Sequence, residues 1–245
     1  MQDLPIDKIN RQFQILSSSC KSFLLIDCIE PMKMNRKITF QNDIRQDTTE
    51  RSLKSQKFFN YCKQYIAFFK NRSYQFLFVD YSLGRFVYEF DERNLLISSS
   101  LYWNPCPLNV EFIQEIEKND LDVMEYIDNI TEKESFVLDQ ISLRSPIRLD
   151  FTREYTDKNK EYHPQWHMHY QHKDTRAKTK NILSLYSYML FVLENCYPWI
   201  YHEKENEEII ELLRRLDRES SQGFKVAKSK IDELGKKIHT LVEFK

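Results

Sequence analysis

Glycine is scarce in this sequence, with three among 245 residues. Phosphate-binding loops of the P-loop and Rossmann types place several glycines at fixed spacing, because their backbone must approach a phosphate closely. The scarcity of glycine therefore excludes nucleotide-binding enzymes of these two classes.

Cysteine is also sparse, and its pattern shows no pairs. The chain has five cysteines, an odd number, and no Cys-x-x-Cys spacing. A zinc ribbon or a dithiol redox centre would need such a pair. We expect all five to be reduced and buried thiols: Cys20, Cys28, Cys62, Cys106 and Cys196.

Long apolar runs are missing as well. The most apolar stretch, Ile182 to Leu193, is interrupted by Ser184 and Ser187, and it is shorter than the roughly 18 residues that a membrane span needs. The first residues do not combine a basic segment with an apolar one, as a signal peptide does. We therefore expect a cytoplasmic protein with no membrane partner.

Net charge is nearly balanced, at −1 at pH 7. Such a chain has no overall attraction to nucleic acid or anionic lipid, although local clusters escape this average. One basic cluster lies between Arg36 and Lys57, and a second consists of Lys173, Arg176, Lys178 and Lys180. Each cluster is either a solvated surface or a site for nucleic-acid phosphates.

Most of the histidines are clustered in one short segment, unlike the cysteines, which are widely spaced. Four of the six histidines fall within ten residues. Side chains of a β-strand alternate between two faces, so His163, His167 and His169 would share one face and Trp166 and Met168 the other. An internal proline and several aromatic residues favour a strand over a helix here. The segment is predicted to have one core face and one histidine face.

A second predicted strand, Ile147 to Phe151, alternates in the same way. Arg148 and Asp150 point away from its three apolar residues. Residues 153–161 are mostly polar, as expected of a loop between two antiparallel strands. If the register buries both apolar faces, Arg148 and Asp150 join the three histidines on one surface. A slip by one residue would separate them.

The other segments predict an α+β fold with an antiparallel β-sheet flanked by helices, over residues 1–200. Apolar residues recur at helical spacing in segments 6–16, 58–69, 112–124 and 182–193. Three β-rich runs separated by turn residues predict a β-meander at 74–79, 85–90 and 95–103.

Residues 201–245 are predicted to form a C-terminal helical appendage. Apolar residues step by three and four from Phe224 to Leu241, and a matching stripe runs from Ile209 to Leu216. Two interpretations remain open. The helices form a hairpin or arm that binds a protein partner or a second copy of the chain, or they are an ordinary pair packed on the body.

Four segments also carry a family resemblance: Phe76 to Phe90, Leu101 to Pro107, Arg148 to Phe151, and His163 to His169 with its His-Pro-x-x-His-x-His pattern. Together they resemble an uncharacterised bacterial family, domain of unknown function twenty-two ninety, over about residues 5 to 200. The resemblance implies a fold outline and a site, with Arg176 matching an arginine expected after the histidines. A more distant likeness to small bacterial toxin families suggests a role in conflict with phages or plasmids.

Three hypotheses fit the face formed by Arg148, Asp150, His163, His167 and His169. The first is metal-assisted hydrolysis of a phosphodiester. His167, His169 and Asp150 would bind zinc, manganese or nickel, with an open position that activates water. Arg148 would stabilise a phosphoryl oxyanion.

The second hypothesis is metal-free chemistry, in which His167 and His169 transfer protons to and from a phosphodiester. Both enzymatic hypotheses favour nucleic acid as the substrate, because the second basic cluster follows the histidines directly. The third is not enzymatic. Arg148 and Asp150 form a structural ion pair, and the chain is an accessory or scaffold subunit that binds a protein or nucleic acid.

Overall fold

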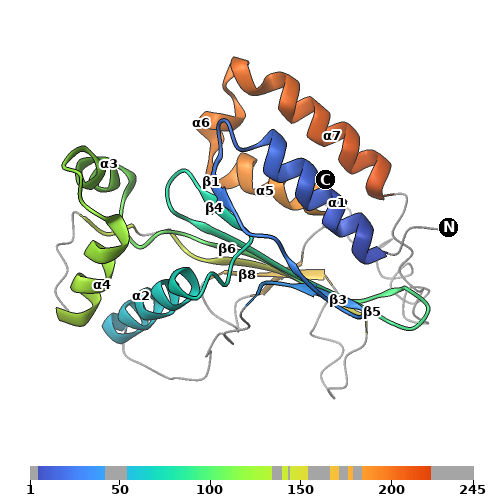
Figure 1. Cartoon of the computed structure of the whole chain (residues 1–245), viewed down its shortest axis with the longest axis horizontal. Coiled ribbons are helices and arrows are strands. Elements are labelled where there is room, and N and C mark those ends of the chain that lie inside the picture. Colours follow the sequence, from blue (N-terminus) through green and yellow to red (C-terminus); the bar gives the residue numbers. More distant parts are fainter. Residues whose placement is uncertain are drawn as a thin grey trace, which may run out of the picture.

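Alternation of apolar and polar residues builds one antiparallel sheet at the centre of the fold (Figure 1). The computed structural model describes residues 5–41, 54–133, 140–142, 144–153, 166–170, 176–178 and 184–221. Within these residues nine strands are ordered β1-β4-β5-β6-β7-β8-β9, and β3 pairs with both β2 and β5. The α+β architecture predicted from the sequence is confirmed.

The longer strands follow the predicted pattern. β4 (Phe76–Phe78), β5 (Leu83–Phe90) and β6 (Leu96–Asn104) form the expected meander. β7 (Ile147–Thr152) and β8 (Trp166–Tyr170) extend it as the two further predicted strands, and β9 (Arg176–Lys178), which was not predicted, pairs antiparallel with β8. β1 (Leu25–Cys28), β2 (Met32–Met34) and β3 (Lys37–Thr39) are absent from the prediction, because three or four residues carry too little alternation.

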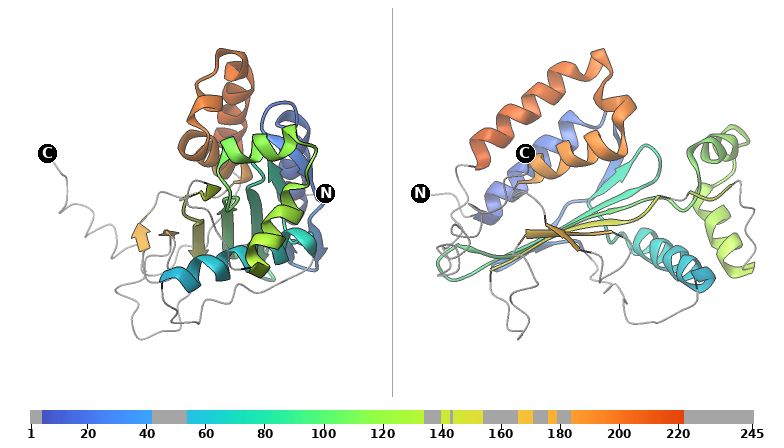
Figure 2. Two further views of the ribbon diagram at one scale, coloured as in Figure 1. Left: turned by 90° about the vertical axis from the view of Figure 1, so that its left-hand side faces the viewer. Right: turned by 180° about the vertical axis from the view of Figure 1, so that it is seen from behind.

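Helices cover both faces of the sheet (Figure 2). α1 (Pro5–Ser19), α5 (Leu185–Cys196) and α7 (Glu207–Ser221) lie over one face, with α6 (Pro198–Tyr201) and the 3-10 turn η3 (Lys204–Asn206) between the last two. α2 (Lys54–Lys70) lies over the other face, beside α3 (Val110–Lys118) and α4 (Val123–Lys133). Two separate clusters of buried apolar side chains accordingly fill the space between the layers.

Local sequence signals explain where several helices begin. The Asn109 side chain accepts a hydrogen bond from the Phe112 backbone at the start of α3, and Ser184 caps α5 in the same way through the Ser187 backbone. The predicted helical segment 112–124 is two helices in the structure. Between them Asp120 takes a positive φ of 53°, which ends α3 and turns the chain.

The C-terminal part of the described chain packs on the body. Leu213 of α7 is fully buried in the same cluster as Val192 and Leu193 of α5. The second predicted stripe, Phe224 to Leu241, lies outside the described residues. In the part of the chain that the structure covers, no helix combines the length and apolarity of a membrane span.

The cysteines are unpaired, as the sequence predicts. All five are free, and four of them are buried while Cys28 is half-buried. Burial raises the pKa of the Cys20, Cys62 and Cys106 thiols to about 12. These thiols are therefore protonated at neutral pH and serve as packing residues.

Candidate metal centre

The pairing of β7 with β8 brings the polar residues of both strands together. Arg148 lies opposite His169, and Asp150 lies opposite His167. The apolar residues pair among themselves, and the Phe151 ring stacks on that of the tryptophan opposite it with centroids 4.3 Å apart. This register is the one expected from burial of both apolar faces.

The same register continues across the sheet. Directly opposed residues of antiparallel strands lie on one face, and a row of them crosses four strands: Arg85, Tyr102, Arg148 and His169. The Arg85 guanidinium lies 3.6 Å from the centroid of the Phe68 ring of α2. The candidate site therefore lies on the face of the sheet that α2 covers near β5.

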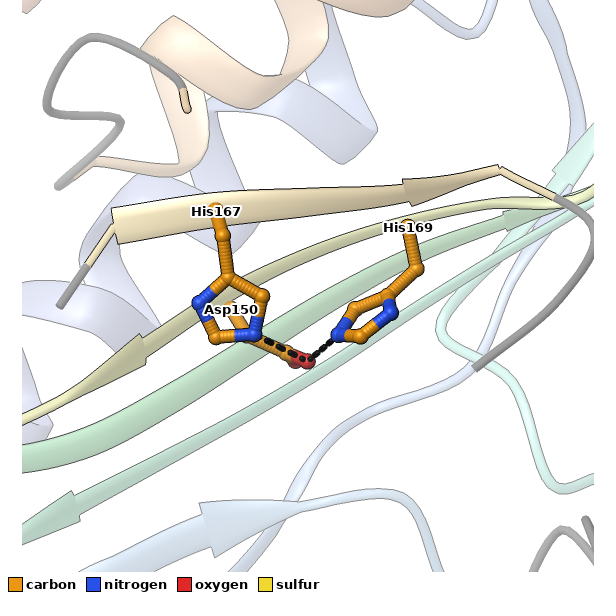
Figure 3. A group of neighbouring side chains, drawn as sticks. All are labelled: Asp150, His167 and His169. Carbon is orange, nitrogen blue, oxygen red and sulfur yellow. Dashed lines mark ion pairs between the residues drawn. The ribbon is translucent and has the colours of Figure 1, made fainter. Parts of the chain in front are cut away.

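One carboxylate oxygen, Oδ2 of Asp150, is the point on which the side chains converge (Figure 3). His169 Nε2 lies 3.2 Å from it and His167 Nε2 lies 3.6 Å from it. Arg148 Nε donates to the same oxygen at 2.7 Å. The two imidazoles meet edge to face, with ring centroids 4.7 Å apart and an angle of 74° between their planes.

The other carboxylate oxygen of Asp150 is held from β6. Ser100 Oγ donates to Oδ1 at 2.8 Å, so Oδ2 is left to face the two histidines. Ser100 also hydrogen-bonds the Tyr102 hydroxyl. Burial, and next the negative charge of Asp150, raise the pKa of Tyr102, which keeps this hydroxyl protonated at neutral pH.

The site is buried on its histidine side and more open at its arginine. The side chains of His167 and His169 are 3% and 7% exposed, whereas that of Arg148 is 27% exposed. The Nδ1 atom of His169 is buried and has no hydrogen-bond partner among the described residues. An unpaired buried ring nitrogen lowers the stability of the fold, and its presence therefore indicates a functional role for the histidine.

Asp150 is ionised in these surroundings. Burial by itself raises the pKa of this carboxyl group. The hydrogen bond with His169, the charge of Arg148 and the hydrogen bond from Ser100 outweigh burial and lower the pKa below its usual value of 3.8. A negative charge therefore stands between two imidazoles at neutral pH.

These three ligand groups fit a divalent cation. One ligand atom each from Asp150, His167 and His169 lies within 4.8 Å of the others. Metal–ligand bonds of about 2.1 Å would place tetrahedral ligands about 3.4 Å apart, and the two distances to Asp150 Oδ2 are 3.2 and 3.6 Å. Two imidazoles and one carboxylate also leave positions for water or substrate, as catalytic metal sites do.

The structure places the predicted site residues in three groups. Arg148, Asp150, His167 and His169 lie together as described above. Arg176 and Lys178 belong to β9, where their backbones pair with His169 and His167. The remaining predicted residues lie outside the described part of the chain: His163, Lys173 and Lys180.

Two residues of the site, Ser100 and Tyr102, are missing from the predicted set. They lie on β6, separated by α3 and α4 from the strand that carries Asp150. A signal is present in the alternation of Ser98, Ser100 and Tyr102, which gives β6 a polar face. That alternation alone does not reveal which strand lies beside β6.

Comparison with known proteins places the chain in a group without an assigned activity. A family model described as "Uncharacterized conserved protein (DUF2290)" matches residues 25–241. The match includes every strand that the structure describes. No curated protein and no solved structure matches the chain.

Proposed function

We propose that this chain, which belongs to the uncharacterised conserved family DUF2290, is a phosphodiester hydrolase assisted by a divalent metal ion. The observation that carries the proposal is the convergence of two imidazole nitrogens and an arginine on one ionised carboxylate oxygen. Ligands of this kind suit zinc or manganese.

Each side chain has a role in this proposal. Asp150, His167 and His169 would hold the cation, which supplies Lewis-acid polarisation of a phosphoryl oxygen and activation of a water molecule. Ser100 orients the Asp150 carboxylate through its hydrogen bond to Oδ1. Arg148 is the most exposed of the charged groups in the site, and it would bind phosphate oxygens and stabilise the charge that develops on them.

Nucleic acid is the proposed substrate. Support comes from two basic residues of β9, Arg176 and Lys178, whose backbones pair with the histidines of the site. Lysine and arginine beside a reactive centre contact the phosphates that flank the cleaved bond. We extend the proposal to a setting of conflict with phages or plasmids, on the distant likeness to bacterial toxin families alone.

A second candidate is a non-catalytic accessory subunit. The observation that favours it is that protein groups already bond both oxygens of the Asp150 carboxylate. Asp150 already accepts hydrogen bonds from Arg148 and Ser100, and both imidazoles are buried. Paired charges and hydrogen bonds of this kind also occur where a polar network specifies the fold.

Metal content and nucleic-acid cleavage together separate the two candidates. We expect chelator-free wild-type protein to contain about one zinc or manganese ion per chain, and the His167→Ala/His169→Ala variant to contain none while it remains folded. His202→Ala is a matched control, because His202 is an exposed histidine outside the site. Metal should be quantified by mass spectrometry, and folding by circular dichroism.

The same preparations should be tested for cleavage of single- and double-stranded DNA and RNA. Loss of both metal and cleavage in the double variant, with both retained in the control, supports the hydrolase. Cleavage that depends on the histidines without any metal points to the metal-free mechanism. Equal metal content in all three proteins, or no cleavage by any of them, contradicts the proposed function.

A further inference from the structure

Arg148 donates to Asp150 Oδ2, the same oxygen that the two histidines approach. We propose that Arg148 is a displaceable counterion. It pairs with Asp150 in the metal-free protein, and a bound metal releases it to contact the phosphate of the substrate. This inference deepens the proposed function and rests on it, because it assigns the site a coupling between metal and substrate.

Competition follows from the distances to a single oxygen. Arg148 Nε lies 2.7 Å from Asp150 Oδ2, closer than either histidine, whose Nε2 atoms lie at 3.2 and 3.6 Å. A guanidinium and a divalent cation on the same carboxylate oxygen repel each other, and the buried histidines limit the water that could screen this repulsion on their side. The metal can therefore bind to all three ligands only if the guanidinium leaves.

Asp150 cannot easily avoid the competition by offering its other oxygen. Ser100 Oγ holds Oδ1 at 2.8 Å, and β6 and β8 pair with β7 on its two sides. The carboxylate is thus fixed with Oδ2 toward the histidines. Both the arginine and the metal must use that oxygen.

Arg148 is the side chain that can move. Its side chain is 27% exposed, against 3% and 7% for His167 and His169. A long side chain with this exposure can turn toward solvent while the buried imidazoles stay in place. Once released, its guanidinium is a bidentate donor suited to a phosphate group.

The consequence is reciprocal coupling of the two ligands. Metal binding frees Arg148 for a phosphodiester, so a bound phosphodiester must in turn favour metal binding. In the metal-free protein the arginine is neutralised by Asp150, and the site attracts a phosphate group less. The pair therefore limits anion binding to the metal-loaded form.

Calorimetric titration with Zn²⁺ or Mn²⁺ tests the competition. We expect Arg148→Gln to bind the metal about tenfold or more tightly than wild type, because a cation beside the ligand oxygen is removed. Arg148→Lys, which keeps the charge, should remain near wild type. Arg153→Gln is the matched control. Arg153 directly follows β7 and pairs with Asp91 at 2.6 Å, and it is not one of the three candidate metal ligands.

Dimethyl phosphate, a minimal phosphodiester, tests the coupling. It should tighten metal binding by wild type and by Arg153→Gln, but not by Arg148→Gln. If wild type binds metal and Arg148→Gln binds it equally or more weakly while folded, the displaceable counterion is wrong and the metal centre stands. If none of the proteins binds metal, the metal centre and this inference both fail.

Discussion

Asp80 and Asp150 are both buried carboxylates paired with an arginine, yet their surroundings differ. Asp80 is bonded by Arg144, by the Tyr197 hydroxyl at 2.7 Å and by the Ser82 backbone at 3.0 Å. Every polar partner of Asp150 named above is a side chain of its own strand, β7, or of one of the two adjacent strands, β6 and β8. Among the described residues, the Asp80 network contains no histidine, whereas two imidazoles face Asp150.

The two networks also differ in how far apart in the sequence their bonded residues lie. Arg144 lies 64 residues from Asp80, and Tyr197 lies 117 residues from it. The Asp80 network therefore joins the turn before β5, the segment before β7 and the end of α5. Arg148 and Asp150 are two residues apart on one strand, and the sheet is already formed there by backbone pairing. The first network therefore joins distant segments of the fold, whereas the second lies between strands that are already paired through their backbones.

Removal of each carboxylate should give the largest contrast in stability. We expect Asp80→Ala to lower the free energy of unfolding by about 3–5 kcal/mol, because Arg144 and the buried Tyr197 hydroxyl both lose the group that joins their segments. Asp150→Ala should cost about 1–3 kcal/mol, since the strands that Asp150 joins stay paired through their backbones. Urea unfolding of the two variants measures both values, and equal losses would contradict the division into structural and ligand-presenting networks.

Removal of one hydroxyl donor from each network sharpens the contrast. Tyr197→Phe should cost about 2 kcal/mol, because Asp80 loses a charge-assisted hydrogen bond in a fully buried position. Ser100→Ala should cost about 1 kcal/mol, and it should weaken metal binding because the Asp150 carboxylate is free to rotate. Unfolding and metal titration should be run on both variants. A change in metal affinity with Tyr197→Phe would contradict the claim that only the Asp150 network affects metal binding.

Acid should reveal the smallest of these effects. The pKa of Asp150 is lower in the folded protein than the value of about 3.9 expected in the unfolded chain. Its ionised form therefore adds stability above pH ~4, and this stability is lost as the pH falls through the folded pKa. The difference in unfolding free energy between wild type and Asp150→Asn should shrink below that pH. A difference that grows on acidification contradicts this assignment.

Local patterns explain which features were predictable. Alternation within two strands that are consecutive in the chain is enough to place Arg148 and Asp150 beside the histidines of β8, because the sequence between the two strands is mostly polar and favours antiparallel pairing. The long strands and most of the helices were predictable for the same reason, because their apolar residues recur at regular spacing. The contacts that join distant segments have no local signal. Ser100 lies 50 residues from Asp150, and only the finished sheet makes them neighbours.

The burial of the histidine face could not be predicted from the sequence either. The sequence suggests a face with a site, and it does not reveal that His167 and His169 would be enclosed. Alternation along one strand shows which side chains share a face, and it does not show what covers that face. The three strands between Leu25 and Thr39 were missed because each has only three or four residues, and β1 and β3 depend on pairing with β4 and β5.

The three candidate ligands sit on two strands that are consecutive in the chain, and this has an evolutionary consequence. Changes at Asp150, His167 and His169 alter only these two strands, whereas the Asp80 network joins other segments of the chain. Natural selection can therefore erase, restore or re-tune the centre without rebuilding the architecture. Descendants with the same backbone would divide into chains that keep the three candidate ligands and chains that have lost them, with differences at only a few positions.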